Sequence, residues 1–298
     1  MTNEISTLSI LIPVYNCDVR NLVKALHQEL IHLPIYAEII CYDDFSVPEI
    51  KKNNREIAHL DKVLYKELPK NHGRSAIRNL LSDAASHTFL LFLDSDSTLV
   101  STDFLKTYLS VKNADVIVGG RIYPNTFDEV YCLHWLVGTK KEVLPAKIRE
   151  KHPYRSLMLN NFLIKKEIFD TVKLNENIKG YGHEDTLLGF ELQSRNIKIA
   201  HIENPVLHYT LQTNEAFLAK TEEAVKNFAW IVKNMEVGKN TPLYKSYYLL
   251  KKARLLALSS LLYKLFSSQI LKNLHSKQPK LCYLDFFKLN LFYLEMNK

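Results

Sequence analysis

The chain has 298 residues, of which 47% are hydrophobic and 24% are charged, and its formal net charge is +7. This composition is that of a folded globular protein and excludes a disordered chain, and the length suits one large α/β domain or a domain with an appendage. The N-terminal residues lack a signal-peptide core, no uncharged run is long enough to span a bilayer, and the four cysteines lack the paired spacing of a zinc or redox site. We therefore expect a cytoplasmic protein with reduced thiols.

The positive charge is concentrated towards the C-terminus. Residues 244–298 carry ten Lys and Arg residues and two acids, a net charge of +8, so residues 1–243 sum to −1. A nearly neutral body argues against a nucleic-acid-binding core, and the basic tail favours an acidic partner.

Short apolar runs alternate with amphipathic segments through the first third of the chain. This alternation predicts a doubly wound, mostly parallel α/β sheet. Strands are expected at 8–16, 37–42, 62–65 and 89–93, and helices at about 19–32, 46–59 and 74–86.

The same alternation continues less regularly to about residue 209. A helix at 102–112, strands at 115–120, 160–164 and 197–201, a helix starting near 166, a helix at about 184–196 and an apolar segment at 204–209 are expected. Gly238–Pro242 is the best linker candidate, because glycine and proline there precede a shift to long apolar helices. The sequence thus predicts a catalytic-type domain at 1–240 and a basic amphipathic helical extension at 241–298.

The run Phe89–Leu93 is apolar on both faces, as in a central buried strand, and is followed by Asp94 and Asp96. Ligands of open α/β sheets bind beyond the carboxyl ends of the strands, and paired carboxylates there suit Mg²⁺ or Mn²⁺. An Asp/Ser turn that simply ends the strand is an equally good interpretation of these residues alone.

Three further motifs carry polar groups that suit a sugar-nucleotide site. Asp43 and Asp44 follow a strand and can accept from a base or ribose, although capping of the next helix is the better interpretation when they are taken alone. Arg74 and Arg78 follow a glycine at a helix start, which suits a diphosphate, or they are solvated surface charges.

Glu184 and Asp185 follow a glycine-flanked loop at a helix start. Acids are favoured there by the helix dipole in any protein, and the functional alternative is a general base that takes a hydroxyl proton. His208 ends an apolar segment and becomes a candidate third metal ligand only if the fold brings it to Asp96.

Taken in order, these motifs resemble a known enzyme family. The matching segments are Ile12–Asn16, Tyr42–Ser46, Asn71–Asn79, Asp94–Asp96 and Glu184–Asp185. Together they look like a family 2 glycosyltransferase of the GT-A fold, which is an inverting enzyme that uses nucleotide-diphospho-sugars. The resemblance covers about Ser6 to Tyr209, and residues 160–185 are also similar to the acceptor-side region of galactosyltransferases.

The resemblance implies a role for each matched residue. Nucleoside contacts are implied for Pro13, Tyr15, Asp43 and Asp44, a ribose contact for Asp94, and a metal contact for Asp96. His208 stays a metal candidate on the condition given above. Asp185 is implied as the general base, Glu184 as a support for the acceptor or donor sugar, and Asn161, Tyr181 and His183 as acceptor-side residues.

The implied reaction is an inverting transfer from a nucleotide sugar, with UDP as the leading base, to a glycan or lipid-linked acceptor, and it uses Mn²⁺ or Mg²⁺. Cell-surface polysaccharide synthesis is the expected setting. A sugar-nucleotide pyrophosphorylase is the rival enzyme, and a catalytically inactive sugar-nucleotide-binding scaffold is the non-enzymatic alternative.

The apolar helices of the tail carry interspersed Lys and Arg, which suits an anionic membrane surface at the inner face of the membrane. A helical cap on the catalytic domain or a contact between two copies explains the same pattern equally well, so the oligomeric state stays open.

Overall fold

The computed structural model describes residues 5–298. The chain forms two compact units that interleave along the sequence. Unit 1 consists of the residues up to Pro124 with Val143–Asn177 and Leu188–Thr210, and unit 2 consists of Asn125–Glu142, Ile178–Leu187 and Leu211–Lys298. A functional boundary after residue 240 stays a prediction.

Unit 1 begins with the predicted alternation of strands and helices. Its elements are β1 (Thr7–Val14), α1 (Arg20–Leu30), β2 (Tyr36–Asp43), α2 (Pro48–Asn54), a 3₁₀ turn (Arg55–His59), β3 (Val63–Glu67), α3 (Arg74–Ala84) and β4 (Phe89–Leu93).

The remainder of unit 1 contains shorter elements. They are β5 (Ser97–Leu99), α4 (Phe104–Leu109), β6 (Val116–Val118), β7 (Arg121–Ile122), α6 (Ala146–Arg149), β8 (Asn161–Lys165), α7 (Lys166–Val172), β9 (Ile199–His201) and β10 (Val206–His208). Helix α8 (Glu184–Ser194) starts in unit 2 and ends in unit 1.

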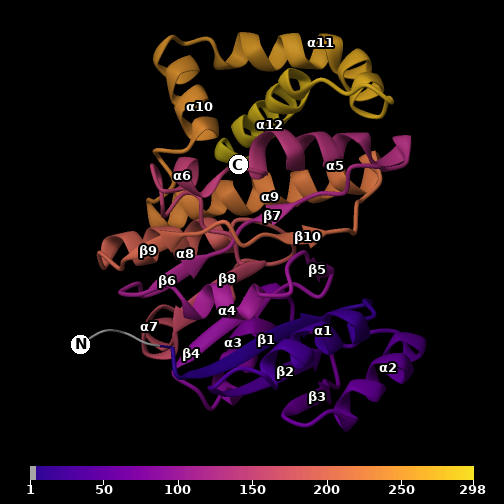
Figure 1. Ribbon diagram of the computed structural model, residues 1–298. Helices are drawn as coiled ribbons and strands as arrows, with labels where there is room; N and C mark the ends of the chain where they lie inside the picture. The colour runs from indigo at the N-terminus through magenta and orange to yellow at the C-terminus, as the bar shows by residue number, and fades with distance from the viewer. Residues whose placement is uncertain (1–4) are drawn as a thin grey trace. The chain divides into compact units, whose positions relative to one another are not determined.

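The main sheet has seven strands in the order β3-β2-β1-β4-β8-β6-β9, which lie side by side in Figure 1. Strand β8 runs antiparallel to β4 and β6, and the other neighbours pair in parallel. This is the mostly parallel α/β sheet that the sequence predicts. Sequence order reverses between β1 and β4, so the edge formed by their carboxyl ends is the topological switch point where such sheets bind ligands.

A second sheet of three short strands has the order β5-β10-β7. Strand β10 pairs antiparallel with β5, in a register that places His208 opposite Ser97. Because β5 begins directly after Asp96, this pairing brings a residue from far along the chain to the end of β4.

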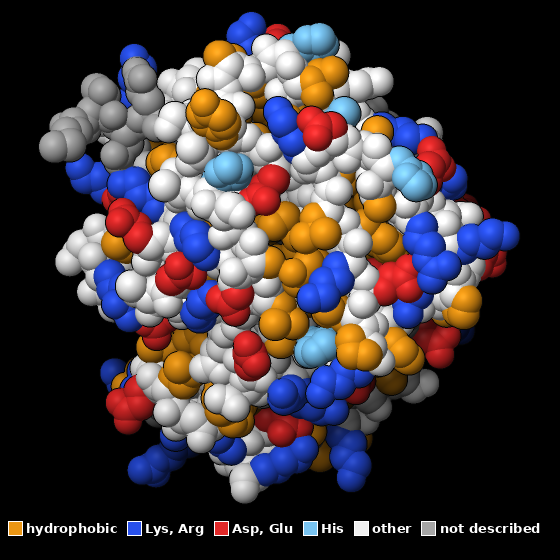
Figure 2. All heavy atoms as spheres, turned by 90° about the horizontal axis from the view of Figure 1, so that it is seen from below, with side chains coloured by type: hydrophobic (Ala, Val, Ile, Leu, Met, Phe, Trp, Pro, Cys, Tyr) orange, Lys and Arg blue, Asp and Glu red, His pale blue; other side chains and the backbone are white. Residues whose placement is uncertain are grey.

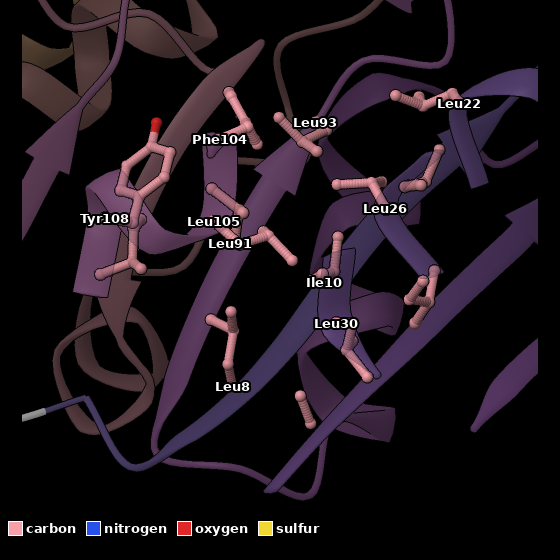
Figure 3. Close-up of a cluster of buried hydrophobic side chains, with 14 of the residues drawn as sticks. Leu8, Ile10, Leu22, Leu26, Leu30, Leu91, Leu93, Phe104, Leu105 and Tyr108 are labelled. Atoms are coloured by element: carbon pink, nitrogen blue, oxygen red, sulfur yellow. The ribbon is translucent and has the colours of Figure 1, made fainter. Parts of the chain in front are cut away.

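The core of unit 1 covers both faces of the main sheet. On one face, shown in Figure 3, Leu91 and Leu93 of β4 pack with Leu22, Leu26 and Leu30 of α1 and with Phe104, Leu105 and Tyr108 of α4. On the other face, Leu90 and Phe92 pack with Ile77 and Leu81 of α3 and Phe169 of α7. All five residues of β4 are buried, which fixes the strand end rigidly.

A buried hydrogen-bond network around Arg149 connects the ends of strands β6 and β9. Arg149 is 1% exposed, and its guanidinium donates to the carbonyls of Val118 and Ile202 at 3.0 and 2.7 Å. His201 lies 3.0 Å from Arg149 through Nδ1 and 3.0 Å from the Pro153 carbonyl through Nε2. Since a carbonyl can only accept, Nε2 carries the proton and Nδ1 accepts from Arg149. Burial lowers the pKa of His201 to about 4, with a further decrease from Arg149 and an opposing increase from the bond to Pro153.

Replacing His201 with glutamine is expected to flatten the acid side of the stability curve. The folded protein keeps His201 neutral down to about pH 4, whereas the unfolded chain takes up the proton near pH 6.5, so the free energy of unfolding falls as pH decreases between these values. From pH 6.5 to 5 the wild type should lose up to about 2 kcal/mol through this residue. Urea unfolding at both pH values, with exposed His59→Gln as the control, checks this. An equal pH dependence in the wild type and His201→Gln would contradict it.

Unit 2 is helical, as the sequence predicts for the C-terminal region. It contains a 3₁₀ turn (Glu129–Tyr131), α5 (Cys132–Val137), a π-helical turn (Gly138–Glu142), α9 (Asn214–Met235), α10 (Pro242–Lys252), α11 (Leu256–Leu274) and α12 (Leu281–Met296). Thr213 caps α9 by accepting from the Ala216 amide at 3.2 Å, and Thr241 caps α10. The apolar faces of α9 and α12 meet at Phe228 and Phe292, whose ring centroids lie 5.3 Å apart.

The surface carries both signs of charge, and the cysteines are unpaired. On the face shown in Figure 2, acidic and basic side chains are interspersed. All four cysteines are free thiols. Among residues 5–298, no helix combines the length and the apolar character needed to cross a bilayer.

Candidate active site

Three strands of the main sheet deliver the predicted donor-site residues to one edge. Strand β1 leads into Tyr15, whose side chain is 57% exposed, β2 ends at Asp43, and β4 leads into Asp94. Pro13, within β1, is half-buried and lies opposite Tyr42 of β2. An exposed aromatic ring at this edge suits stacking against a nucleobase.

Asp43 is fully buried at the end of β2. Its Oδ1 accepts from the Ser46 amide at 2.7 Å, and its Oδ2 accepts from the Tyr65 hydroxyl at 3.1 Å. Ser46 in turn accepts from the Asn16 amide at 2.8 Å. Asp43 thus ties the loop after β1 to the turn after β2, and it does not cap α2, which begins after Val47 with no side-chain cap.

Asp44 holds the start of α3. Its carboxylate oxygens accept from the amides of His72 and Gly73 at 2.7 and 2.9 Å, and the Asn71 side chain donates to its carbonyl at 3.0 Å. Gly73 has φ of +85°, a conformation that favours glycine, and α3 starts at the next residue. The Asp44 carboxylate therefore fixes the direction in which the α3 N-terminus presents its backbone amides.

The two arginines of α3 have different environments. Arg74 is exposed in the first turn. The Arg78 side chain is 3% exposed, donates to the Arg74 carbonyl at 2.9 Å and forms an ion pair with Asp94. Burial raises the pKa of Asp94, but the positive charges of Arg78, Arg74 and Arg121 lower it by more, so its pKa lies below the ordinary value. Arg78 therefore keeps Asp94 ionised at the end of β4.

Asp96 and His208 meet as the metal hypothesis requires. His208 Nδ1 lies 3.2 Å from Asp96 Oδ1, and the Tyr209 amide donates to the Asp96 carbonyl at 3.3 Å. The imidazole also packs edge-on against Tyr123, with ring centroids 5.5 Å apart. Within the part of the chain that the structure describes, no group of three or more acidic, His or Cys side chains is arranged to hold a metal. Asp96 and His208 are the two candidate ligands that the fold brings together, and metal binding by them stays a prediction.

The structure adds neighbours that the sequence motifs did not include. Cys17 Sγ lies 3.3 Å from the Ser95 carbonyl and 3.5 Å from the Tyr209 hydroxyl. Burial raises the pKa of the Cys17 thiol, and the nearby Asp96 charge raises it further. Cys17 and Tyr209 come from opposite ends of unit 1. Their contact depends on the pairing of β10 with β5, which the sequence motifs did not predict.

Unit 2 holds the predicted base and its neighbour at the start of α8. Glu184 is buried, and Asp185 is half-buried with Oδ1 accepting from the Thr186 amide at 2.7 Å. The preceding loop is attached to α9, because the Asn227 side chain donates to the carbonyls of Lys179 and Tyr181 at 2.8 and 3.0 Å.

Tyr181 and His183 also contact α9. The Lys220 ammonium lies 5.1 Å from the centre of the Tyr181 ring. The His183 ring stacks on Phe228 with centroids 4.8 Å apart, and burial, helped by Lys288, lowers the pKa of His183 to about 4. His183 is therefore neutral near pH 7, and acceptor contact by His183 stays a prediction.

Asn161 lies in the interior of unit 1. It accepts from the Tyr108 hydroxyl at 2.6 Å and donates to the carbonyls of Gly120 and Asn204, both at 2.8 Å. Gly119 has no room for a side chain here, since a Cβ would lie 2.4 Å from the Asn161 amide nitrogen. The amide is fully used within the protein, and acceptor contact by Asn161 stays a prediction.

The fold and the site together agree with the comparison with protein families. The model of Glycosyl transferase family 2 matches residues 9–173, more than half of the chain. The chain belongs to glycosyl transferase family 2. The match includes the strand ends at Asp43, Asp94 and Asp96, and it stops before His208 and Asp185.

Two solved structures similar to this family 2 glycosyltransferase show the same fold at low identity. Mannosyltransferase PcManGT from Pyrobaculum calidifontis, in complex with GDP-Man and Mn²⁺, aligns with a TM-score of 0.58 and 12% identity over 97% of this chain and 85% of its own. S. aureus TarS 1–349 aligns with a TM-score of 0.51 and 14% identity over 98% of this chain and 90% of its own. A longer TarS structure is covered over 40% of its length, with a TM-score of 0.48 and 17% identity over 76% of this chain. A search of curated protein sequences found no significant match.

Proposed function

We propose that this family 2 glycosyltransferase is an inverting hexosyltransferase that uses a nucleotide-diphospho-sugar, with UDP-sugars as the first candidates. The acceptor in this proposal is a hydroxyl of a glycan or a lipid-linked sugar in cell-surface polysaccharide synthesis. The observation that carries the proposal is the pair Asp96–His208, with 3.2 Å between Oδ1 and Nδ1, at the carboxyl end of the central strand β4.

Asp96 and His208 would hold a divalent ion, Mn²⁺ or Mg²⁺. The donor set fits, since a carboxylate oxygen and an imidazole nitrogen converge there, and Mn²⁺ accepts both kinds of ligand. A bound ion would neutralise the charge that develops on the departing diphosphate.

The other residues of unit 1 would bind and orient the donor. Tyr15 would stack on the base, and Asp94, kept ionised by Arg78, would accept from a ribose hydroxyl. Arg74 and the backbone amides of the α3 N-terminus would contact the diphosphate, because both present positive charge there.

In unit 2, Asp185 would take the proton from the acceptor hydroxyl as the sugar is transferred. One displacement at the anomeric carbon, with a base and no enzyme nucleophile, inverts its configuration. Glu184 would support the acceptor or donor sugar, and Tyr181 and His183 would contact the acceptor.

A two-arm assay of the full chain tests the proposal against the pyrophosphorylase alternative. One arm supplies UDP-glucose, UDP-galactose, UDP-N-acetylglucosamine or GDP-mannose with MnCl₂, and thermal stabilisation and release of nucleoside diphosphate are measured. The other arm supplies a nucleoside triphosphate with a sugar 1-phosphate, and release of pyrophosphate is measured. We expect a signal only in the first arm. Pyrophosphate release would favour the rival enzyme, and stabilisation without turnover would favour the scaffold.

The exposed face of α11 is the second part of the proposal. Leu258, Leu261, Leu262, Leu265, Phe266 and Leu271 are each 36–64% exposed, whereas Ile270 and Leu274 are the buried residues of this helix. Lys264 and Lys272 lie on the same helix, and α10 ends with Lys251 and Lys252. Apolar side chains interspersed with bases suit an anionic membrane surface, at which a lipid-linked acceptor would be available.

Vesicle binding by the full chain tests this part. We expect co-sedimentation with vesicles that contain phosphatidylglycerol but not with phosphatidylcholine alone, weakening as salt rises. The variant Leu261→Ser/Leu265→Ser/Phe266→Ser should lose most binding, whereas Ile31→Ser, at a 51% exposed position in unit 1, should not. No binding in the wild type at any salt concentration, together with a concentration-dependent dimer, would show that a second copy covers this face instead.

A further inference from the structure

Asn160 lies next to Asp94 on the face of the sheet that carries α3. The β4–β8 register pairs Leu93 with Asn161, so Asp94 lies opposite Asn160, and the Asp94 amide donates to the Asn160 carbonyl at 3.1 Å. Phe92, two residues before Asp94, and Phe162, two residues after Asn160, stack with ring centroids 5.1 Å apart. Side chains two residues apart on a strand share a face, so the Asn160 and Asp94 side chains are on the same face as this aromatic pair.

The Asn160 amide is buried and makes no hydrogen bond within the protein. The residue is 2% exposed, and neither Nδ2 nor Oδ1 has a hydrogen-bond partner among residues 5–298. The Nε atom of Arg78, the arginine paired with Asp94, is also buried without a hydrogen-bond partner among these residues. The side-chain amide of Asn161, the residue after Asn160, does form hydrogen bonds within the protein. The unbonded amide is therefore specific to one of the two adjacent asparagines. A buried amide left unbonded is costly, and native proteins rarely keep one without a reason.

The chemistry around Asn160 selects the kind of ligand. The charge of Arg78 is already compensated by Asp94, so Arg78 itself is not available to a phosphate. An amide offers a donor and an acceptor side by side, which matches a hydroxyl or a pair of neighbouring hydroxyls. Asp94 beside it has 20% of its side chain exposed, so this position is at the border of the donor site.

We propose that Asn160 binds a ring hydroxyl of the sugar carried by the nucleotide donor and thereby helps to select that sugar. This inference rests on the proposed use of a nucleotide sugar. The amide atoms are enclosed, so binding requires the side chain to rotate towards Asp94. That rotation breaks no hydrogen bond, because the amide makes none.

The replacement Asn160→Leu separates this role from a structural one. Leucine has a similar size and removes both polar atoms, so the melting temperature should stay unchanged or rise. The matched control is Asn214→Leu in unit 2. Asn214 is 5% exposed but accepts from the Leu133 amide at 2.8 Å and donates to the Ser276 carbonyl at 3.2 Å, so its replacement should lower the melting temperature.

Calorimetric titration in MgCl₂ then compares two ligands, the best nucleotide sugar of the panel and its nucleoside diphosphate. The wild type should bind the nucleotide sugar more tightly than the nucleoside diphosphate. In Asn160→Leu the affinity for the nucleotide sugar should fall about tenfold, while that for the nucleoside diphosphate stays within about twofold.

Four results would overturn the inference. A lower melting temperature in Asn160→Leu, matching that of Asn214→Leu, would show a structural or water-bonded amide. An equal loss of affinity for both ligands would place Asn160 away from the sugar. If the wild type binds neither ligand, the proposed function fails and this inference fails with it, whereas intact wild-type binding with no effect of Asn160→Leu defeats this inference alone.

Discussion

Replacing Asp96 with asparagine is expected to lower kcat at least about 100-fold and to remove the dependence of nucleotide-sugar affinity on Mn²⁺. The change keeps the size of the side chain but removes the charge that would hold the ion beside the diphosphate. Steady-state release of nucleoside diphosphate across a range of MnCl₂ concentrations measures both effects. His208→Ala should give a similar defect, and the double variant should be little worse than either single one, because both residues would serve one ion.

The control for this series is Asp103→Asn. Asp103 lies a few residues later, with its side chain 66% exposed and 3.6 Å from the Lys106 ammonium, so its loss should leave turnover unchanged. Near wild-type activity and unaltered metal dependence in Asp96→Asn would remove Asp96 from the diphosphate site.

Replacing Asp185 with asparagine is expected to lower kcat by about 10²–10⁴-fold, because the acceptor hydroxyl would lose its general base. Affinity for the nucleoside diphosphate should change little. In the wild type, kcat/KM should fall at acidic pH as the base is protonated, and this acidic limb should be absent from the residual activity of the variant.

Glu191→Gln on the same helix is the matched control. Glu191 lies 3.9 Å from Arg195 in an ion pair and is 38% exposed, so its loss should leave kcat and the pH profile as they are. Turnover close to wild type in Asp185→Asn would assign the base to another residue.

Strands with a strong local signal could be predicted from the sequence. Phe89–Leu93 is apolar on both faces, and the structure has β4 at the predicted bounds, fully buried. The short strands β5 and β10 have three residues each, which is too few for a periodic pattern, and what pairs them is contact across a long stretch of chain. The sequence therefore could not predict whether His208 lies near Asp96. Only the β5–β10 register shows that the two residues are close.

The direction and register of β8 could not be predicted from the sequence either. An apolar run of five residues has the same appearance whether it pairs parallel or antiparallel. The adjacent Asn160 and Asn161 are chemically identical, and only the pairing of Leu93 with Asn161 decides which one is bonded in the core and which one lies beside Asp94. The interleaving of the two units, in which residues 178–187 belong with the C-terminal helices, likewise depends on contacts such as Asn227 with Tyr181.

The anomeric configuration of the first product tests the central claim most directly. The full chain would be incubated in MgCl₂ with the α-linked nucleotide sugar that the panel identifies, and early ¹H NMR spectra would be recorded with water or a glycan as the acceptor. Inverting transfer predicts a β-anomeric product together with free nucleoside diphosphate. An α-anomeric product, or sugar 1-phosphate with nucleoside monophosphate in place of free nucleoside diphosphate, would contradict it.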